Sequence, residues 1–363
     1  MTADPIAWDL AERVAARVGG REPFAESYHL ESLVRDFEEL TAEAETLVEA
    51  ETGLVSNAGP ARARVTDRLG WVQANLASFR RLLRPLTERL GDRISPNPVA
   101  ARMTRTVAGA EVGALLGWMS TRVLGQYDLL LVEDESPEDQ DVVYYVGPNV
   151  LALEKRYAFP PREFRLWLAL HEVTHRAQFT GIPWLRGHFL SLVDASLGSV
   201  DPDPKRLLAA LRRAVEEARA GRNPLDEGGL VALLATPEQQ EVLGRIGGMM
   251  SLLEGHGDVT MDRAAGDRIP SADRFSRALH QRRTQQSGPA KAMQKLLGLE
   301  AKLKQYEQGE QFIAAVEAYG GPELLQRAWT GAEWLPSLEE VRQPMRWIER
   351  AEAARPEPVR LEG

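Results

Sequence analysis

Residues 160–183 read PPREFRLWLALHEVTHRAQFTGIP, and this stretch carries the strongest helix signal of the chain. Two prolines stand at its start, where the missing N–H group of proline costs little because the first turn of a helix leaves it unused. Gly181 and Pro183 then favour an end shortly after Phe179. The sequence therefore predicts a well-delimited helix over Pro161–Phe179.

The centre of this helix is the pentapeptide His171-Glu172-Val173-Thr174-His175. Histidines four residues apart lie one turn above each other, so both rings can reach one ion at about 2.0–2.1 Å. Glu172 lies near the same face and can take a proton from an attacking water, its role in HExxH motifs. The neighbouring positions are apolar, so the three polar groups need a metal or hydrogen-bond partners. A zinc site is predicted; two hydrogen-bonded core histidines are the structural alternative.

The chain has no cysteine and six histidines, so any metal must be held by imidazole and carboxylate groups. A net charge of -9 argues against a nucleic-acid partner, which would need a concentrated basic surface. The first twenty residues form an amphipathic pattern rather than a signal peptide, and no apolar run reaches the roughly 18 residues of a membrane span. We expect a soluble, cytoplasmic protein with no membrane partner.

Helical periodicity continues over most of the chain. Further helices are expected over residues 24–51, 66–90, 101–123, 204–220, 230–234, 237–257, 287–318 and 337–354. The acidic run between Glu43 and Glu51 should face water. Gly109, Gly113 and Gly117 fall on one helical face, where they would let a second helix approach closely.

Two β-like runs, 128–132 and 141–146, flank an acidic linker, which fits a hairpin or two edge strands. The breaker at 95–100 is the first plausible hinge. The expected fold is mainly α, with a small hairpin or short sheet near the active-site helix. We expect a helical N-terminal portion (1–100) packed on a catalytic unit (101–355), followed by a flexible tail (356–363), or one composite domain.

A hydrolytic zinc site needs a third protein ligand and an open position for water. The metzincin pattern requires a glycine at position 178 and a histidine at position 181, where this chain has Gln178 and Gly181, so that class is excluded. The segment SLLEGHGD (251–258) places Glu254 and Asp258 one helical turn apart. This pair resembles the ExxxD half of gluzincins, the thermolysin-like proteases. The resemblance implies that Glu254 binds zinc and that Asp258 orients His171.

His256 competes with Glu254, because Gly255 and Gly257 leave the direction of its side chain open. It could bind the metal or donate a hydrogen bond to an oxyanion. Tyr306 and Arg282 are further candidates for stabilising a tetrahedral intermediate, although packing or solvated roles are the simpler interpretation for each of them.

The segment FRLWLALHEVTHRAQFTGIPWLRGHF (164–189) resembles the type 2 family of zincin-like metallopeptidases, which is associated with the biosynthesis of a deazaflavin coenzyme. Other blocks agree in the same order: GWMSTRVLGQYDLLL (117–131), YYVGPNV (144–150), LLEGHGDVTMD (252–262), LLGLEAKLKQYEQGEQF (296–312) and LPSLEEVRQPMRWIER (335–350). The resemblance implies a mostly helical zincin-like fold and a zinc-dependent hydrolase.

The predicted function is a zinc metallopeptidase in which His171, His175 and Glu254 hold zinc, while Glu172 activates water and protonates the leaving amine. One alternative is hydrolysis of a small non-peptide amide or ester. An exposed strand beside the zinc helix, for example 144–146, would favour an extended peptide, whereas a closed pocket would favour the small molecule. The second alternative is a non-catalytic helical protein whose structural zinc has His256 as a fourth ligand.

Overall fold

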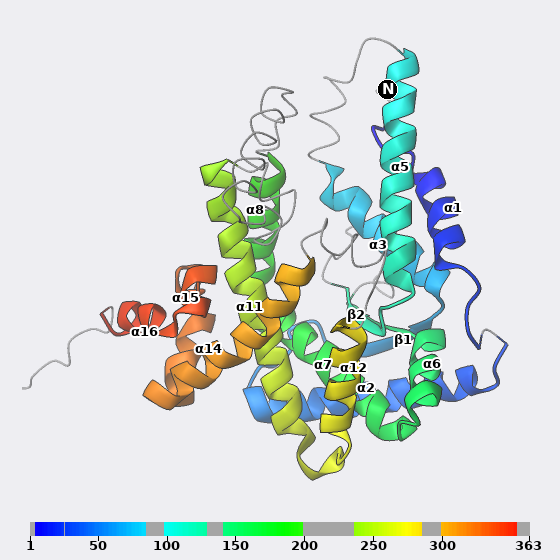
Figure 1. Cartoon of the computed structure of the whole chain (residues 1–363). Coiled ribbons are helices and arrows are strands. Elements are labelled where there is room, and N and C mark those ends of the chain that lie inside the picture. Colours follow the sequence, from blue (N-terminus) through cyan, green and yellow to red (C-terminus); the bar gives the residue numbers. More distant parts are fainter. Residues whose placement is uncertain are drawn as a thin grey trace, which may run out of the picture. The chain divides into compact units, whose positions relative to one another are not determined.

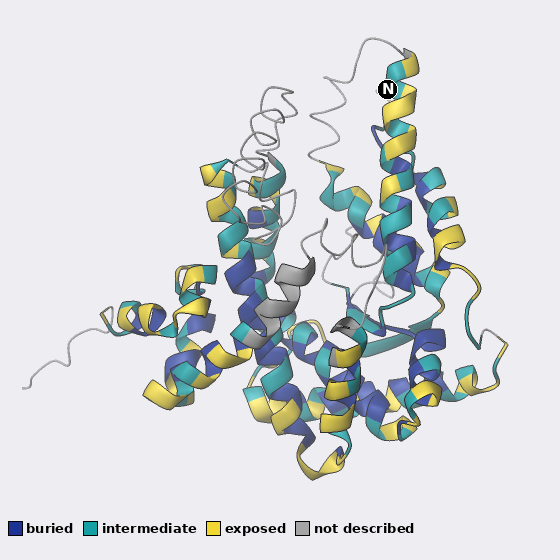
Figure 2. Cartoon of the chain, viewed as in Figure 1, coloured by how far each residue is buried: buried dark blue, intermediate teal, exposed yellow. Residues whose placement is uncertain are grey.

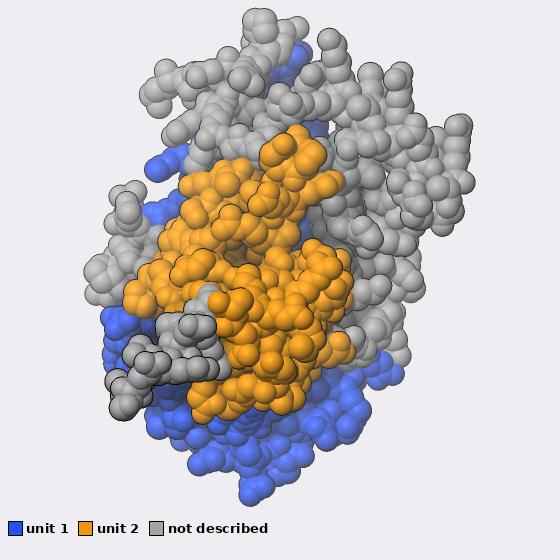
Figure 3. Space-filling view, turned by 90° about the vertical axis from the view of Figure 1, so that its left-hand side faces the viewer, with its two compact units in different colours: residues 1–181, 260–284 blue, residues 182–259, 285–363 orange. Residues whose placement is uncertain are grey.

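The computed structural model of the chain describes residues 4–24, 26–84, 98–128, 141–198, 236–284 and 299–353. Within these residues helices dominate, and three short strands form one mixed sheet (Figure 1). This confirms the expected mainly α fold with a small sheet. Two compact units are distinguished in Figure 3: residues 1–181 with 260–284 form unit 1, and residues 182–259 with 285–363 form unit 2.

Unit 1 contains the sheet and the helices that cover it. Its elements in chain order are α1 (Trp8–Gly19), α2 (His29–Thr52), β1 (Arg62–Thr66), α3 (Arg68–Leu82), α5 (Pro98–Ser120), β2 (Gly125–Tyr127), β3 (Val142–Val146), α6 (Gly147–Tyr157), α7 (Pro161–Gly181), the end of α11 (Pro237–Ala265), η1 (Gly266–Arg268) and α12 (Ala272–Thr284).

The sheet has the order β1-β3-β2, with β1 parallel and β2 antiparallel to the central strand. The predicted second strand is β3, but it is paired on both sides and fully buried, so it is not an edge strand. The first strand of the antiparallel pair, β2, begins at Gly125, before the predicted run; residues 129–132 of that run lie outside the described residues. Sequence reasoning missed β1, because its five residues include only two apolar ones, Ala63 and Val65, between the arginines and Thr66.

Successive residues of β3 face opposite sides of the sheet, so both sides carry part of the core. The ring of Tyr145 stacks on Phe37 of α2 at 3.8 Å between centroids, and its hydroxyl lies 2.8 Å from the hydroxyl of Thr41. Val146, on the other side, joins a cluster with Trp71 of α3 and Leu116 of α5. The exposed residues of the helices lie on their outward faces (Figure 2).

Helices α1 and α5 lie side by side in Figure 1 and pack through small residues. The three glycines of α5 each lie against the backbone of an alanine in α1 or directly before it: Gly109 against Ala7, the N-cap, Gly113 against Ala11, and Gly117 against Ala15. A Cβ atom added at any of them would overlap a backbone carbonyl group. The four-residue spacing of the glycines thus provides the close helix approach that the sequence predicts.

Unit 2 is entirely helical in its described part. It contains α8 (Leu185–Gly198), most of α11, α14 (Leu299–Gln326), η2 (Arg327–Trp329), η3 (Ala332–Trp334), α15 (Leu338–Arg342) and α16 (Pro344–Ala353). A kink interrupts α14 at Gly321, which has a φ of 75° and precedes Pro322. The helices predicted over 204–220 and 230–234 lie outside the described residues. None of the described helices has the length and apolar character needed to cross a bilayer.

Candidate metal centre

Helix α7 carries the HExxH motif through the interior of unit 1. It begins at Pro161 as predicted, and most of its residues between Phe164 and Phe179 are buried. The exceptions include His171 and His175, which are half-buried. These two histidines of an otherwise buried helix therefore keep part of their surface accessible, which a metal ion would need in order to reach them.

The two imidazole rings are arranged for one shared ion. Their centroids are 4.7 Å apart and their planes are nearly perpendicular, at 85°. Nδ1 of His175 lies 3.0 Å from Oε1 of Gln178. An amide oxygen can only accept, so Nδ1 carries the proton and Nε2 keeps its lone pair for a metal. Gln178 thus selects the tautomer that a ligand histidine needs.

Glu172 is 8% exposed and lies against strand β2. Its Oε2 accepts a hydrogen bond of 3.1 Å from the backbone N–H of Tyr127. A Cβ atom on Gly125 would come within 2.7 Å of Cγ and 2.9 Å of Oε1 of Glu172. The carboxylate is therefore fixed by the backbone of two residues of one strand, and the glycine provides the space.

This contact uses the outer edge of β2. The N–H of Asp128 donates to the carbonyl oxygen of Val142, and the carbonyl oxygen of Leu124 accepts from the N–H of Val146. These residues flank β2, and both bonds are directed toward β3. In an antiparallel pair the alternate residues Gly125 and Tyr127 then direct their backbone groups away from β3. Helix α7 occupies that side through Glu172.

The described residues contain a group of His and Glu side chains suited to a metal ion. His171, His175 and Glu254 each offer one ligand atom, and together they could hold a metal ion. Two nitrogens and one carboxylate oxygen match the donor set of a catalytic zinc site, which keeps a fourth position for water. Zinc therefore fits the chemistry of these side chains.

Helix α11 carries Glu254, His256 and Asp258. The helix runs without a break through Gly255 and Gly257, and a Cβ atom at Gly255 would lie 2.6 Å from the backbone nitrogen of Glu310. The glycine at 255 thus permits close packing of α14 rather than a break. His256 is buried, with its ring 5.0 Å from that of Trp329.

The remaining predicted candidates occupy other places. Arg282 lies on α12 and donates to the carbonyl oxygens of Arg122 and Thr121 just beyond the end of α5, at 3.4 and 3.3 Å. Cationic donors are favourable at such helix ends. Tyr306 lies on α14, and its side chain is outside the described residues. Asp258 is half-buried, one turn after Glu254.

Two buried arginines that sequence reasoning missed hold α7 in place. Arg165 binds Glu154 with two hydrogen bonds of 2.8 Å and also pairs with Asp36. Arg176 binds Asp141 at 2.7 and 3.1 Å and Glu45 at 2.6 Å. Glu45 therefore does not simply face water, as the acidic run in α2 had suggested.

The environment of these ion pairs is polar but enclosed. Burial raises the pKa of Glu154, and its hydrogen bonds from Arg165 oppose that rise. Burial also raises the pKa of the Tyr145 phenol, which keeps it neutral. The sequence did carry one signal for these two anchoring arginines. They are eleven residues apart on an apolar helix, a separation of three turns, so they lie on one face.

Comparison with known proteins agrees with this architecture. A crystal structure of a presumed hydrolase with a novel fold from Chloroflexus aurantiacus matches with a TM-score of 0.69 and 29% identity, over 96% of this chain and 99% of that one. No curated protein matches the sequence. The family model described as zincin-like metallopeptidase matches residues 6–348. The chain therefore belongs to the zincin-like metallopeptidase family.

Proposed function

We propose that this protein is a zinc-dependent hydrolase in which His171, His175 and Glu254 hold the metal and Glu172 is the general base. The observation that carries the proposal is the arrangement on α7: two half-buried histidines one turn apart and, between them in sequence, a buried carboxylate whose direction is fixed by strand β2. Zinc, when bound, supplies Lewis-acid activation of water and of a substrate carbonyl.

The protein's own groups account for the remaining steps. Glu172, with Oε2 held by the Tyr127 N–H, can take a proton from the attacking water and deliver it to the leaving group. Gln178 keeps the proton of His175 on Nδ1. Asp258 is the proposed partner of His171, and His256 and Tyr306 remain candidates for an oxyanion donor.

Peptide hydrolysis is the first candidate reaction because the family is a metallopeptidase family. A small amide or ester is the second, and the sheet favours it. β3, which contains 144–146, is paired on both sides, and the outer edge of β2 is directed at Glu172. Neither strand offers a free edge to an extended peptide beside α7, so a compact substrate or a chain end fits better than β-augmentation.

The test compares the wild type with Glu172→Gln after metal analysis of both proteins. Each is given zinc and assayed on a peptide library and on a panel of small N-acyl amides and esters. Because Glu172 is not in the proposed ligand set, the variant should retain zinc with an affinity within about threefold, and lose about 10²–10⁴-fold in rate. Glu163→Gln, the same change nine residues earlier on α7, is the matched control and should keep full activity.

Full activity of Glu172→Gln would refute its role as the base. Loss of zinc on Glu254→Gln is expected, and unchanged affinity would remove Glu254 from the ligand set. A zinc ion with four protein ligands and no exchangeable water, together with no hydrolysis of either panel, would instead support the structural-zinc alternative.

A further inference from the structure

Two residues of α7, Glu172 and Arg176, are both tied to Tyr127 of strand β2. Glu172 accepts from the Tyr127 backbone N–H at 3.1 Å. The Tyr127 hydroxyl donates to Oδ1 of Asp141 at 3.1 Å, and Oδ2 of the same carboxylate accepts from Arg176. Since residues four apart share a helix face, backbone and side chain of one tyrosine are anchored to successive turns of α7.

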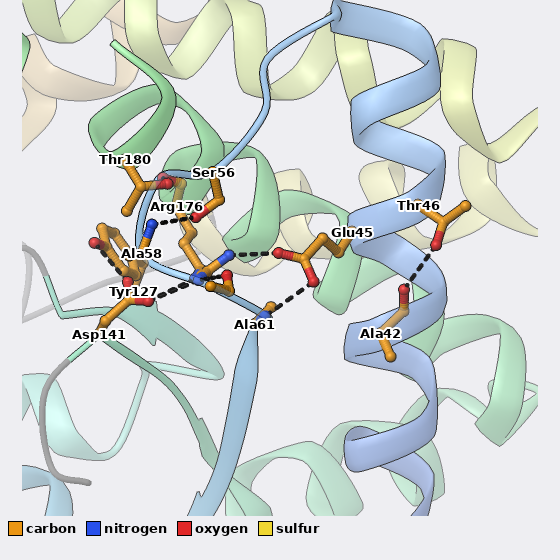
Figure 4. A network of polar contacts seen from close by, with 11 residues as sticks. Ala42, Glu45, Thr46, Ser56, Ala58, Ala61, Tyr127, Asp141, Arg176 and Thr180 are labelled. Atoms are coloured by element: carbon orange, nitrogen blue, oxygen red, sulfur yellow. Dashed lines mark hydrogen bonds and ion pairs between the residues drawn. The ribbon is translucent and has the colours of Figure 1, made fainter. Parts of the chain in front are cut away.

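Asp141 connects the two halves of this network (Figure 4). It is 6% exposed, stands immediately before β3, and has a φ of 54°. Left-handed backbone costs about 1 kcal/mol for a residue with a side chain, and Asp and Asn tolerate it best. The carboxylate is thus kept at a position where the backbone alone would favour glycine.

Arg176 gives the network a rigid base. Its side chain is 1% exposed, and it also donates to Oε1 of Glu45 and to the backbone oxygen of Gly59, both at 2.6 Å. Figure 4 shows the guanidinium group between Glu45 on α2 and Asp141 beside the sheet. A planar group with several directed donors cannot move without breaking multiple bonds.

We infer that Asp141 is a positioning residue for Glu172, acting through Tyr127. The inference rests on the proposed function only for its catalytic consequence. Arg176 fixes Asp141, Asp141 fixes the Tyr127 side chain, and the Tyr127 backbone N–H then holds one oxygen of Glu172. Gly125 leaves the space in which that carboxylate lies. The strand therefore orients the base from its backbone.

The direct test observes the Tyr127 amide in the metal-free protein. The chain has seven tyrosines, so selective ¹⁵N-tyrosine labelling gives at most seven amide signals. Tyr127→Phe identifies the signal by its disappearance. Glu172→Ala should move it upfield and accelerate its exchange with solvent, because a hydrogen bond to a charged acceptor is lost.

The decisive variant is Asp141→Asn, which keeps a side chain that tolerates left-handed backbone. Asparagine replaces the charged acceptor by one neutral oxygen and an NH2 group, so the bond from the tyrosine hydroxyl must reverse or break and the bonds from Arg176 lose their charged acceptor. We expect the Tyr127 amide to shift and to exchange at least about tenfold faster. Arg176→Lys, which keeps the charge and loses the fork, should act in the same direction and serves if Asp141→Asn fails to fold.

Glu154→Gln is the matched control. It also removes one charge from a buried carboxylate that binds a buried arginine of α7 through two N–H groups, but at Arg165, three turns away. It should leave the Tyr127 signal in place. An unchanged signal in Asp141→Asn would overturn the inference, and so would an equal shift in Glu154→Gln, which would show general loosening of α7.

The catalytic consequence is measured separately, on whichever substrate the hydrolysis assay identifies. Asp141→Asn should lower kcat by about tenfold or more while KM and zinc affinity stay near the wild-type values. If no substrate is found, the amide experiment still decides whether Asp141 controls Tyr127. If the amide responds and kcat does not, the positioning role is refuted while the hydrolase proposal stands.

Discussion

Gly113→Ala tests whether the packing of α1 against α5 depends on glycine or merely tolerates it. Gly113 is buried in the middle of α5, and a Cβ atom there would meet the carbonyl oxygen of Ala11, with Cα and C of Ala11 each 2.9 Å away. Those atoms belong to a helix backbone, so no side-chain rotation can relieve the overlap.

Two effects of opposite sign compete in this substitution. Alanine is favoured over glycine in a helix interior by about 1 kcal/mol. A contact at 2.9 Å is about 0.5 Å inside the 3.4 Å at which ordinary contact begins, and overpacking of this kind costs about 1–3 kcal/mol, occasionally more. Moving α1 away would instead expose Ala11, Ala15 and Trp8, which are now at most 7% exposed. Because the carbonyl oxygen of Ala11 lies nearer still than the two carbons, the steric cost should fall in the upper part of this range, about 2–3 kcal/mol. The net loss is then roughly 1–2 kcal/mol.

The assay is thermal and urea unfolding of the purified chain, read by circular dichroism. For a unit of this size the loss corresponds to a decrease in Tm of about 2–8 °C. Gly244→Ala is the control, since Gly244 lies inside α11 with nothing described within 4 Å of the added atom. It should be neutral or stabilising by up to about 1 kcal/mol. A Gly113→Ala protein as stable as the wild type would refute the close-packing argument.

Three further predictions concern the site and unit 2. Gly125→Ala should displace the Glu172 carboxylate by about 0.7 Å and lower kcat roughly 10–100-fold with zinc affinity retained; activity within twofold of wild type would contradict this. Gln178→Ala should weaken zinc binding about 10–100-fold in chelator competition, since it removes the acceptor of His175 Nδ1; unchanged affinity would exclude that role. Burial, with Arg245 nearby, lowers the pKa of His188, so the unfolded state binds more protons. The associated stability is present above about pH 6.5 and is lost as pH falls below it, and His188→Gln should flatten the urea-unfolding profile between pH 5 and 7.

The sequence predicted the parts of the fold that depend on local pattern. The proline pair and Gly181 mark both ends of α7, and the glycine repeat at 109, 113 and 117 indicated a close helix neighbour. Both features are encoded within one helix, so its period makes them visible. The helix that packs on the glycine face, α1, lies about a hundred residues earlier in the chain, and no local pattern could identify it as the partner.

Strand pairing was predicted less well, for a physical reason. The five residues of β1, RARVT, alternate between polar and apolar, but the run is short and contains only two apolar residues, so it does not stand out as a strand. Its parallel pairing with β3 joins residues 80 positions apart, such as Arg62 and Val142. With β1 unseen, β3 was expected in a hairpin or at an edge, and 144–146 was therefore the strand named as one that would favour a peptide if it were exposed.

At the candidate site, likewise, the sequence predicted the motif residues but not the residues that support them. His171, Glu172 and His175 follow from the chemistry of one pentapeptide, whereas Gly125, Tyr127, Asp141 and Gln178 gain a role only when the chain brings them to α7. Gln178 illustrates the difference. In the sequence it mattered as the residue that excludes one zincin class, and in the structure it is the hydrogen-bond acceptor of His175.

The charge distribution on α7 explains how a helix so deeply buried can be held while it carries the proposed metal site. Arg165 and Arg176 bind α2, α6 and the sheet on one side, with Asp36 and Glu45 spaced along α2 to meet them. These contacts fix the rotation and the position of the helix, since each guanidinium group must meet its carboxylates in one geometry. The histidine face is then left half-buried without being needed to hold the helix. A neutral core could bury α7 equally well, but it would not determine which face meets the edge of β2, and the direction of the Glu172 carboxylate depends on that choice.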